Sequence, residues 1–170
     1  MDVRHTVIPT DLGPVTVVAR DRALVGLYFA EHTRRPADET FGPRVDLDED
    51  PLLAEAARQL RAYLAGDRLD FDLPLAPAGD GFQHAVWKIV AAVPRGETTT
   101  YGAIARGLGD PKLAQRVGQA VGANPLCVYV PCHRVVGADG SLTGYAGGLA
   151  RKRALLDLEE PSAEDASRLF

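Results

Sequence analysis

The chain has 170 residues, of which 46% are hydrophobic and 25% charged, and its formal net charge is −4. This length and composition suit one large domain or two small ones with a proper hydrophobic core. No run of about 18 apolar residues occurs, which argues against a membrane span, and acidic residues dominate positions 1–80 while basic residues outnumber acidic ones at 81–160.

The first half of the chain predicts a small sheet followed by a helix. Residues 5–9, 15–19 and 24–29 are short β-branched or aromatic runs separated by turn residues, which indicates an antiparallel meander. Residues 31–50 are polar and lack any period, so a loop is expected there. A helix then begins at Pro51 and ends at Gly66, and the Pro- and Gly-rich stretch LPLAPAGDG at 73–81 is typical of a linker.

Helical spacing dominates after the linker. A first helix carries apolar residues from Phe82 onward and is stopped by Pro94. Two short helices follow, one starting near a cap at Thr99 and covering 101–108, the other starting at Asp110-Pro111 and ending near residue 122. Such a pair is a candidate helix-turn-helix, although the spacing alone favours an ordinary helical hairpin packed in a core.

The last third is irregular until its final helix. The apolar run 126–130 predicts a buried strand or extended segment entering Pro131, and residues 137–148 form a loop with five glycines. A helix is expected over 149–159. Its inward residues are predicted to be Ala150, Ala154, Leu155 and Leu158, and its outward residues Arg151, Lys152 and Arg153.

A cysteine and a histidine stand side by side in VPCHRVVG (130–137). A thiol of ordinary pKa is mostly protonated at pH 7, so a nucleophilic Cys132 needs a neighbouring base such as His133. Adjacent residues of an extended segment point to opposite faces, so either the backbone turns here or a water links the two. A base also needs a partner on its other nitrogen, for which Glu159 is a candidate. The alternative is an inert, buried cysteine.

Only one other cysteine, Cys127, is present, and it is expected merely to pack. Cys127, Cys132 and His133 match no common zinc spacing, so no metal site is predicted. The start, MDVRHTVIPTDLG, lacks the basic head and apolar stretch of a signal peptide, and two cysteines give no disulfide framework. A cytoplasmic location is therefore expected.

Two longer stretches carry a resemblance to a known family. The segment PCHRVVGADGSLTGYAGGLARKRALLDLE (131–159) resembles the active-site segment of the O6-alkylguanine-DNA alkyltransferases, or methylated-DNA–protein-cysteine methyltransferases. FQHAVWKIVAAVPRGETTTYGAIA (82–105) is similar to the helices that precede it there, and LGPVTVVARDRALVGLYF more loosely to the family's ribonuclease-H-like domain.

This resemblance implies an α+β fold in two domains. A small ribonuclease-H-like antiparallel sheet with a helix would span residues 1–76, and a linker would cover 77–81. A mostly helical DNA-binding and alkyl-acceptor domain with a winged helix-turn-helix would span 82–160, and 161–170 would form a tail.

The resemblance also implies roles for individual residues. Cys132 would attack the alkyl carbon of an O6-alkylguanine that has been flipped out of the duplex. His133 would take the thiol proton through a water, and Glu159 would orient that imidazole. Asn124 would brace the turn around the thiol, and Tyr101 would donate a hydrogen bond to the guanine ring as negative charge develops on it.

Further residues would bind the substrate. The carbonyl of Val135 and the amides of Tyr145 and Ala146 would read the guanine edge. The residues expected to contact DNA are Thr100, Gln115, Arg116 and Gly118.

One departure from the family pattern concerns the residue that fills the space left by the flipped base. The family usually has Ala-Arg-Ala-Val-Gly, whereas this chain has Ala-Gln-Arg-Val-Gly at 114–118. Gln115 therefore takes the finger position, and Arg116 points about 100° away on a helix. We expect Arg116 to contact a phosphate instead.

The sequence therefore predicts a DNA repair protein that transfers an alkyl group, once and irreversibly, to its own Cys132. O6-alkylguanine in double-stranded DNA is the expected substrate, with O4-alkylthymine as a further candidate. No metal, organic cofactor or membrane partner is expected, and the chain is expected to act as a monomer, with clustering on DNA left open. The alternatives are a non-catalytic lesion- or DNA-binding helix-turn-helix module and a cysteine hydrolase.

Overall fold

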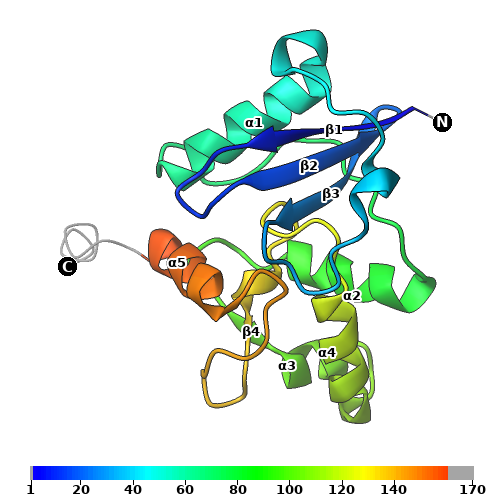
Figure 1. The fold of residues 1–170 in the computed structure, drawn as a ribbon. Coiled ribbons are helices and arrows are strands. Elements are labelled where there is room, and N and C mark those ends of the chain that lie inside the picture. Colours follow the sequence, from blue (N-terminus) through cyan, green and yellow to red (C-terminus); the bar gives the residue numbers. More distant parts are fainter. Residues whose placement is uncertain (1, 161–170) are drawn as a thin grey trace.

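The computed structural model describes residues 2–160, and its N-terminal part is the expected antiparallel meander. Strands β1 (Val3–Ile8), β2 (Val15–Arg20) and β3 (Ala23–Phe29) pair in the order β1-β2-β3 (Figure 1). The turn between β2 and β3 places Asp21 at φ 53°, a left-handed conformation that aspartate tolerates better than most residues. The expected tail, 161–170, lies outside the described residues.

Helix α1 (Pro51–Leu64) packs against this sheet (Figure 1). It begins where predicted, because Asp50 accepts a hydrogen bond from the Leu53 amide (3.1 Å) and Pro51 occupies the first helical position. The stretch predicted to be a loop, residues 31–50, also contains two short 3₁₀-helices, η1 (Asp38–Phe41) and η2 (Leu47–Glu49). Apolar periodicity cannot detect elements of three or four residues.

Helix α2 (Gly81–Ala91) opens the second half of the chain. A capping box starts it: Asp80 accepts from the Gln83 amide (2.8 Å), and the Gln83 side chain accepts from the Asp80 amide (2.9 Å). The indole of Trp87 then donates to the carbonyl of Ala120 (2.8 Å). This buried hydrogen bond fixes α2 against a later helix, α4 (Ala114–Gly122).

The helix-turn-helix consists of α3 (Tyr101–Gly107) and α4. Two details differ from expectation. Thr100, rather than Thr99, caps α3 by accepting from the Ala103 amide (3.0 Å). The segment after Asp110 forms a 3₁₀-helix, η3 (Pro111–Leu113), before α4 begins.

The segment predicted as a strand at 126–130 is a tight turn with only isolated bridges, Leu27 to Leu126 and Cys127 to Val130. It leads into a 3₁₀-helix, η4 (Cys132–Arg134), and then β5 (Val135–Val136). Strand β5 pairs in parallel with β4 (Thr99–Thr100), so the residues after the thiol are attached to the start of α3.

The final helix, α5 (Leu149–Glu159), has the predicted bounds, and Leu155 is buried as predicted, but two residues of this helix were placed on the wrong face. Ala150 is exposed, whereas Lys152 is fully buried. The aliphatic stem of a lysine can pack in a core if its amine finds hydrogen-bond acceptors, and periodicity alone classes every lysine as outward.

Both halves of the chain share one core. Tyr129 donates to the carbonyl of Ala56 in α1 (3.0 Å), and Leu27 of β3 donates to the carbonyl of Pro125 (2.8 Å). The buried apolar residues of the sheet, α1 and the C-terminal helices form a single contiguous cluster. Within the described residues, no helix is both long enough and apolar enough to cross a bilayer.

Candidate active site

Cys132 and His133 lie together in the short helix η4. The backbone turns at this point rather than running extended, which resolves how two adjacent side chains can serve one site. His133 is completely buried and its Nε2 lies 3.0 Å from Glu159 Oε2, at the end of α5. Cys132 is 4% exposed. The structure thus pairs the imidazole with the predicted carboxylate and places the thiol on the preceding residue of the same 3₁₀ turn.

Glu159 is the centre of a wider hydrogen-bond network. Arg134 donates from Nε to Oε1 (2.9 Å) and from Nη2 to Oε2 (2.7 Å), and the hydroxyl of Tyr63 in α1 also donates to Oε2. Burial alone would raise the pKa of Glu159, but the hydrogen bonds from Arg134, His133 and Tyr63 outweigh it and hold the pKa far below its usual range. Glu159 is therefore ionised at neutral pH.

The other nitrogen of the imidazole has no partner. His133 Nδ1 is buried and makes no hydrogen bond to any part of the described chain. Burial lowers the pKa of His133 more than the carboxylate of Glu159 raises it, so the ring is neutral at pH 7. With Nε2 donating to Glu159, Nδ1 carries the free lone pair and can accept a proton.

A second thiol adjoins Cys132. The Sγ atoms of Cys127 and Cys132 lie 3.8 Å apart. Hydrogen bonding with Cys127 lowers the pKa of Cys132 despite burial, and Asn124 and the charge of Lys152 act in the same direction. Cys132 is therefore the thiol of the pair that ionises first, as a nucleophile must.

Asn124 fastens the turn that precedes the thiol. Its Nδ2 donates to the carbonyl of Val130 (3.0 Å), and its Oδ1 accepts from the amide of Leu126 (2.9 Å). Both contacts are buried, so they tie the two ends of the 126–130 turn together.

A cavity of about 480 Å³ opens between the helix-turn-helix and the glycine-rich loop. Five residues that were predicted to contact the substrate or DNA line this cavity: Tyr101, Gln115, Gly118, Tyr145 and Ala146. Thr33 and Arg34, which the sequence analysis missed, contribute from the N-terminal half, and the Thr33 amide donates to the carbonyl of Ala146 (2.8 Å). No local signal marks them, because they reach the cavity only through the fold.

Tyr101 and Gly118 meet inside this cavity. The hydroxyl of Tyr101 is 2.9 Å from Thr143 Oγ1. A Cβ atom at Gly118 would lie 3.7 Å from Cδ1 of the Tyr101 ring, so α4 passes close to this ring.

Lys152 holds the backbone beside the thiol. Its Nζ donates to the carbonyl of Val135 (2.6 Å) and to that of Thr143 (2.8 Å). The Val135 carbonyl, predicted to read the guanine edge, thus already accepts one hydrogen bond and keeps a second lone pair. Burial lowers the pKa of Lys152, and the neighbouring Cys132 opposes this shift.

Two predicted DNA-contacting residues do not line the cavity. Thr100 caps α3, and Arg116 places its guanidinium carbon 4.0 Å from the ring centroid of Phe82 in α2. Gln115 and Arg116 therefore face different sides of α4, as one residue of helical rotation requires.

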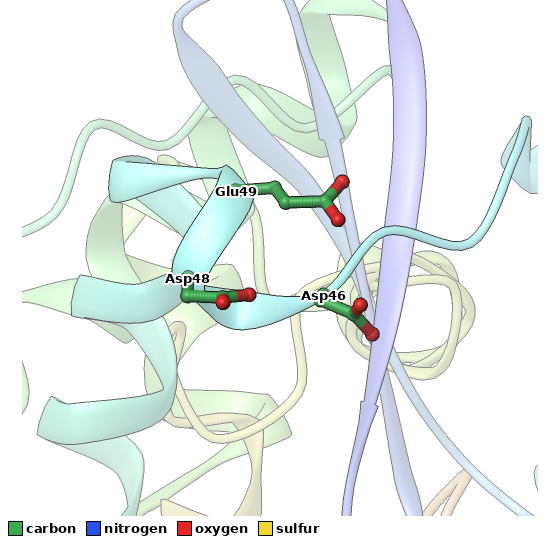
Figure 2. A group of neighbouring side chains, drawn as sticks. All are labelled: Asp46, Asp48 and Glu49. Carbon is green, nitrogen blue, oxygen red and sulfur yellow. The ribbon is translucent and has the colours of Figure 1, made fainter.

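One group of carboxylates in the described chain could hold a metal ion by distance. Asp48 and Glu49 lie on η2 and Asp46 directly before it, with ligand oxygens within 4.8 Å of one another (Figure 2). All three are exposed, and exposed acidic groups are common without an ion. Nothing in their surroundings points to a ligand.

The fold and site define an α+β protein that joins a small sheet to a helix-turn-helix, buries a cysteine, a histidine and a glutamate, and has a cavity between the helix-turn-helix and the glycine-rich loop. Two family models match the chain: the 6-O-methylguanine DNA methyltransferase ribonuclease-like domain at residues 3–77, and the DNA-binding domain of the same family at 81–161. The methylated-DNA–protein-cysteine methyltransferase of Mycobacterium bovis is 42% identical over 99% of both chains.

Solved structures agree with these matches. A crystal structure of the Mycobacterium tuberculosis O6-methylguanine methyltransferase superposes with a TM-score of 0.83 at 41% identity, covering 99% of this chain and 100% of that one. Mycobacterium tuberculosis OGT in complex with DNA gives a TM-score of 0.84, at 43% identity over 92% of each chain. The chain belongs to the 6-O-methylguanine DNA methyltransferase family.

Proposed function

We propose that this protein repairs O6-alkylguanine in double-stranded DNA by transferring the alkyl group to its own Cys132. The observation that carries the proposal is the state of His133, which follows Cys132 directly in the chain: Nε2 is fixed by Glu159, while Nδ1 is buried without a partner among the described residues. This is the arrangement of a general base whose orientation is set by a carboxylate. Family membership supplies the substrate class.

The reaction is a single displacement. A water between Cys132 Sγ and His133 Nδ1 relays the thiol proton to the imidazole, and Glu159 stabilises the imidazolium that forms. The thiolate attacks the alkyl carbon, the bond between that carbon and O6 breaks, and guanine leaves with the electron pair. Tyr101 donates a hydrogen bond to the departing guanine, exchanging its Thr143 partner for the base.

The product is a thioether, which is neither a base nor a leaving group. The described residues offer no second activated nucleophile that could release the alkyl group from it. Each molecule therefore acts once. The presence of Cys132 beside its base argues against a module that only binds the lesion.

Base recognition follows from the cavity. The flipped guanine enters between Tyr101 and the Tyr145–Ala146 backbone, which line the cavity. The amides of Tyr145 and Ala146 read its edge, together with the free lone pair of the Val135 carbonyl. Gln115, at the rim of the cavity, occupies the space that the base leaves in the duplex. Thr100, Arg116 and the close approach allowed by Gly118 position the DNA backbone against α3 and α4. O4-alkylthymine is a further substrate that the same cavity admits.

We also propose that the protein acts on DNA as a monomer. We assign the alkyl-acceptor domain to residues 82–160 and the ribonuclease-H-like domain to 1–76, with 77–81 as the linker. The assignment is supported by the two separate family matches, although both parts share one core.

Mass spectrometry of the full chain after incubation with an O6-methylguanine duplex tests this function. One methyl group per chain should appear, and fragmentation should place it on Cys132. Cys132→Ala should gain none, whereas Cys127→Ala should still accept one. The mechanism would be contradicted if each chain repaired many duplexes and stayed unmodified, or if the methyl group appeared on another residue.

A further inference from the structure

The second cysteine of the chain lies in contact with the first. Cys127 and Cys132 are both free thiols, 0% and 4% exposed, and their sulfurs are 3.8 Å apart. Bonded sulfurs are about 2.0 Å apart, so the two atoms need to approach by roughly 2 Å to form a disulfide. Packing explains why a buried cysteine is tolerated at 127, but packing does not require it to face the nucleophile.

The backbone between the two cysteines holds them on the same side of a compact turn. The Val130 amide donates to the carbonyl of Leu126 (2.8 Å), and the Tyr129 amide donates to that of Cys127 (2.9 Å). Val128 has φ 73°, a left-handed conformation in which a β-branched residue is strained. This conformation reverses the chain so that sulfurs five residues apart meet.

The two thiols differ in reactivity. Hydrogen bonding between them lowers the pKa of Cys132 and, together with burial, raises the pKa of Cys127. Oxidants of the peroxide class attack the thiol with more thiolate character. Cys132 is thus the sulfur that is oxidised first, with a protonated thiol already touching it.

We propose that Cys127 is a resolving cysteine, which closes a reversible intrachain disulfide with Cys132 when a peroxide oxidises the site. In the first step the Cys132 thiolate attacks one oxygen of the peroxide, the O–O bond breaks, and Cys132 becomes a sulfenic acid while water is released. In the second step the Cys127 sulfur attacks the sulfenic sulfur, the S–O bond breaks, and the Cys127 proton leaves with the hydroxide as water. The pair loses two electrons in total.

The disulfide has two consequences for the protein. It blocks alkyl acceptance, because the Cys132 sulfur has no thiolate left to attack with; this consequence rests on the proposed function. It also diverts the sulfenic acid from irreversible oxidation to the sulfinic acid. A dithiol reductant restores both thiols by thiol–disulfide exchange, so this oxidation of the site is reversible.

The test oxidises the reduced full-length chain with hydrogen peroxide, blocks remaining thiols with N-ethylmaleimide, and measures intact mass. Both cysteines fall in one tryptic peptide, residues 117–134. Wild type should lose two hydrogen atoms per chain, take up no maleimide in that peptide, and regain its two thiols with dithiothreitol. Cys127→Ser cannot close the bond, so its Cys132 should instead react with dimedone and then gain oxygen irreversibly.

Methyl transfer gives a second readout. The activity of each variant after oxidation and reduction is compared with the activity of the same variant before treatment. Wild type should recover its activity and Cys127→Ser should not. Irreversible oxygen addition to wild type, a disulfide between chains, or two thiols that peroxide leaves unchanged would each overturn the proposal. The mass readout does not depend on methyl transfer, so a protein that forms the disulfide but accepts no methyl group refutes the proposed function alone.

Discussion

Glu159 receives hydrogen bonds from Tyr63, His133 and Arg134, and these partners exist together only in the folded chain. The folded-state pKa of Glu159 therefore lies below its unfolded value of about 4.3. A depressed carboxyl pKa stabilises the fold above the unfolded pKa, and this contribution is lost as the pH falls through the folded pKa. We expect Glu159→Gln to lower the free energy of unfolding by about 3 kcal/mol at pH 7, because Arg134 then stays buried without its counter-charge.

The pH dependence separates this effect from a packing defect. As the pH falls below about 5, Glu159 of unfolded wild type binds a proton that the folded chain does not, and only wild type loses stability in this way. The difference between wild type and Glu159→Gln should therefore shrink. Denaturant unfolding at a series of pH values measures it. Glu160→Gln, at the exposed neighbouring carboxylate, serves as the control and should leave the curve unchanged. A deficit in Glu159→Gln that stays constant with pH would contradict the interpretation.

Lys152 is the buried cation of α5, and its amine satisfies two carbonyls of the loop after the thiol. Lys152→Met keeps most of the volume but leaves those carbonyls unpaired, so we expect a loss of about 2 kcal/mol in the free energy of unfolding. Because the charge of Lys152 helps to lower the pKa of Cys132, the variant should also form its thiolate at higher pH. Ultraviolet thiolate absorbance against pH measures this shift. Arg153→Met, at its exposed neighbour, should change neither quantity.

At the level of elements, α4 presents different side chains to the cavity and to α2. Gln115 faces the cavity and Arg116 stacks on Phe82. We expect Gln115→Ala to slow methyl transfer on duplex DNA while leaving the rate on a single-stranded oligonucleotide unchanged, since only the duplex leaves a space to be filled. Arg116→Ala should instead weaken binding, with a salt slope smaller in magnitude by about 1, and keep the rate at saturating DNA. Equal effects of Gln115→Ala on both substrates would make the finger assignment wrong.

The elements also show what the sequence can and cannot predict. The three strands and α1 follow from periodicity, turn residues and the cap at Asp50, because these signals are local. The burial of Lys152 could not be predicted, since it depends on two carbonyls supplied by a distant loop. Likewise Glu159 could be proposed as the partner of His133, but not the contribution of Tyr63, which lies 96 residues away in the chain. The segment 126–130 was predicted to be extended because a run of apolar residues gives no signal for the left-handed backbone conformation of Val128.

At the level of the whole molecule, the N-terminal half supports the site directly. Tyr63 comes from α1, yet its hydroxyl donates to the same Glu159 oxygen that His133 contacts. Arg95 lies over the Tyr63 ring at 5.3 Å and donates to the carbonyl of Leu158 (3.1 Å), which fixes the end of α5. The N-terminal part therefore helps to set the orientation and charge of the carboxylate behind the base.

A pair of tyrosines tests this link between the halves. Tyr63→Phe and Tyr129→Phe each remove one buried hydrogen bond between α1 and the C-terminal part, and each should cost about 1 kcal/mol of stability. Only Tyr63→Phe removes a donor from Glu159, so only this variant should change the pH profile of the methyl-transfer rate. With one hydrogen bond fewer, the carboxylate is more basic and holds the proton of His133 more tightly, which raises the pKa of the imidazole. As the pH is lowered, the rate should therefore begin to fall at a higher pH than in wild type, because the imidazole becomes protonated earlier. Single-turnover kinetics across the pH range measures this shift. Identical profiles for the two variants would mean that the N-terminal half supports the site only through packing.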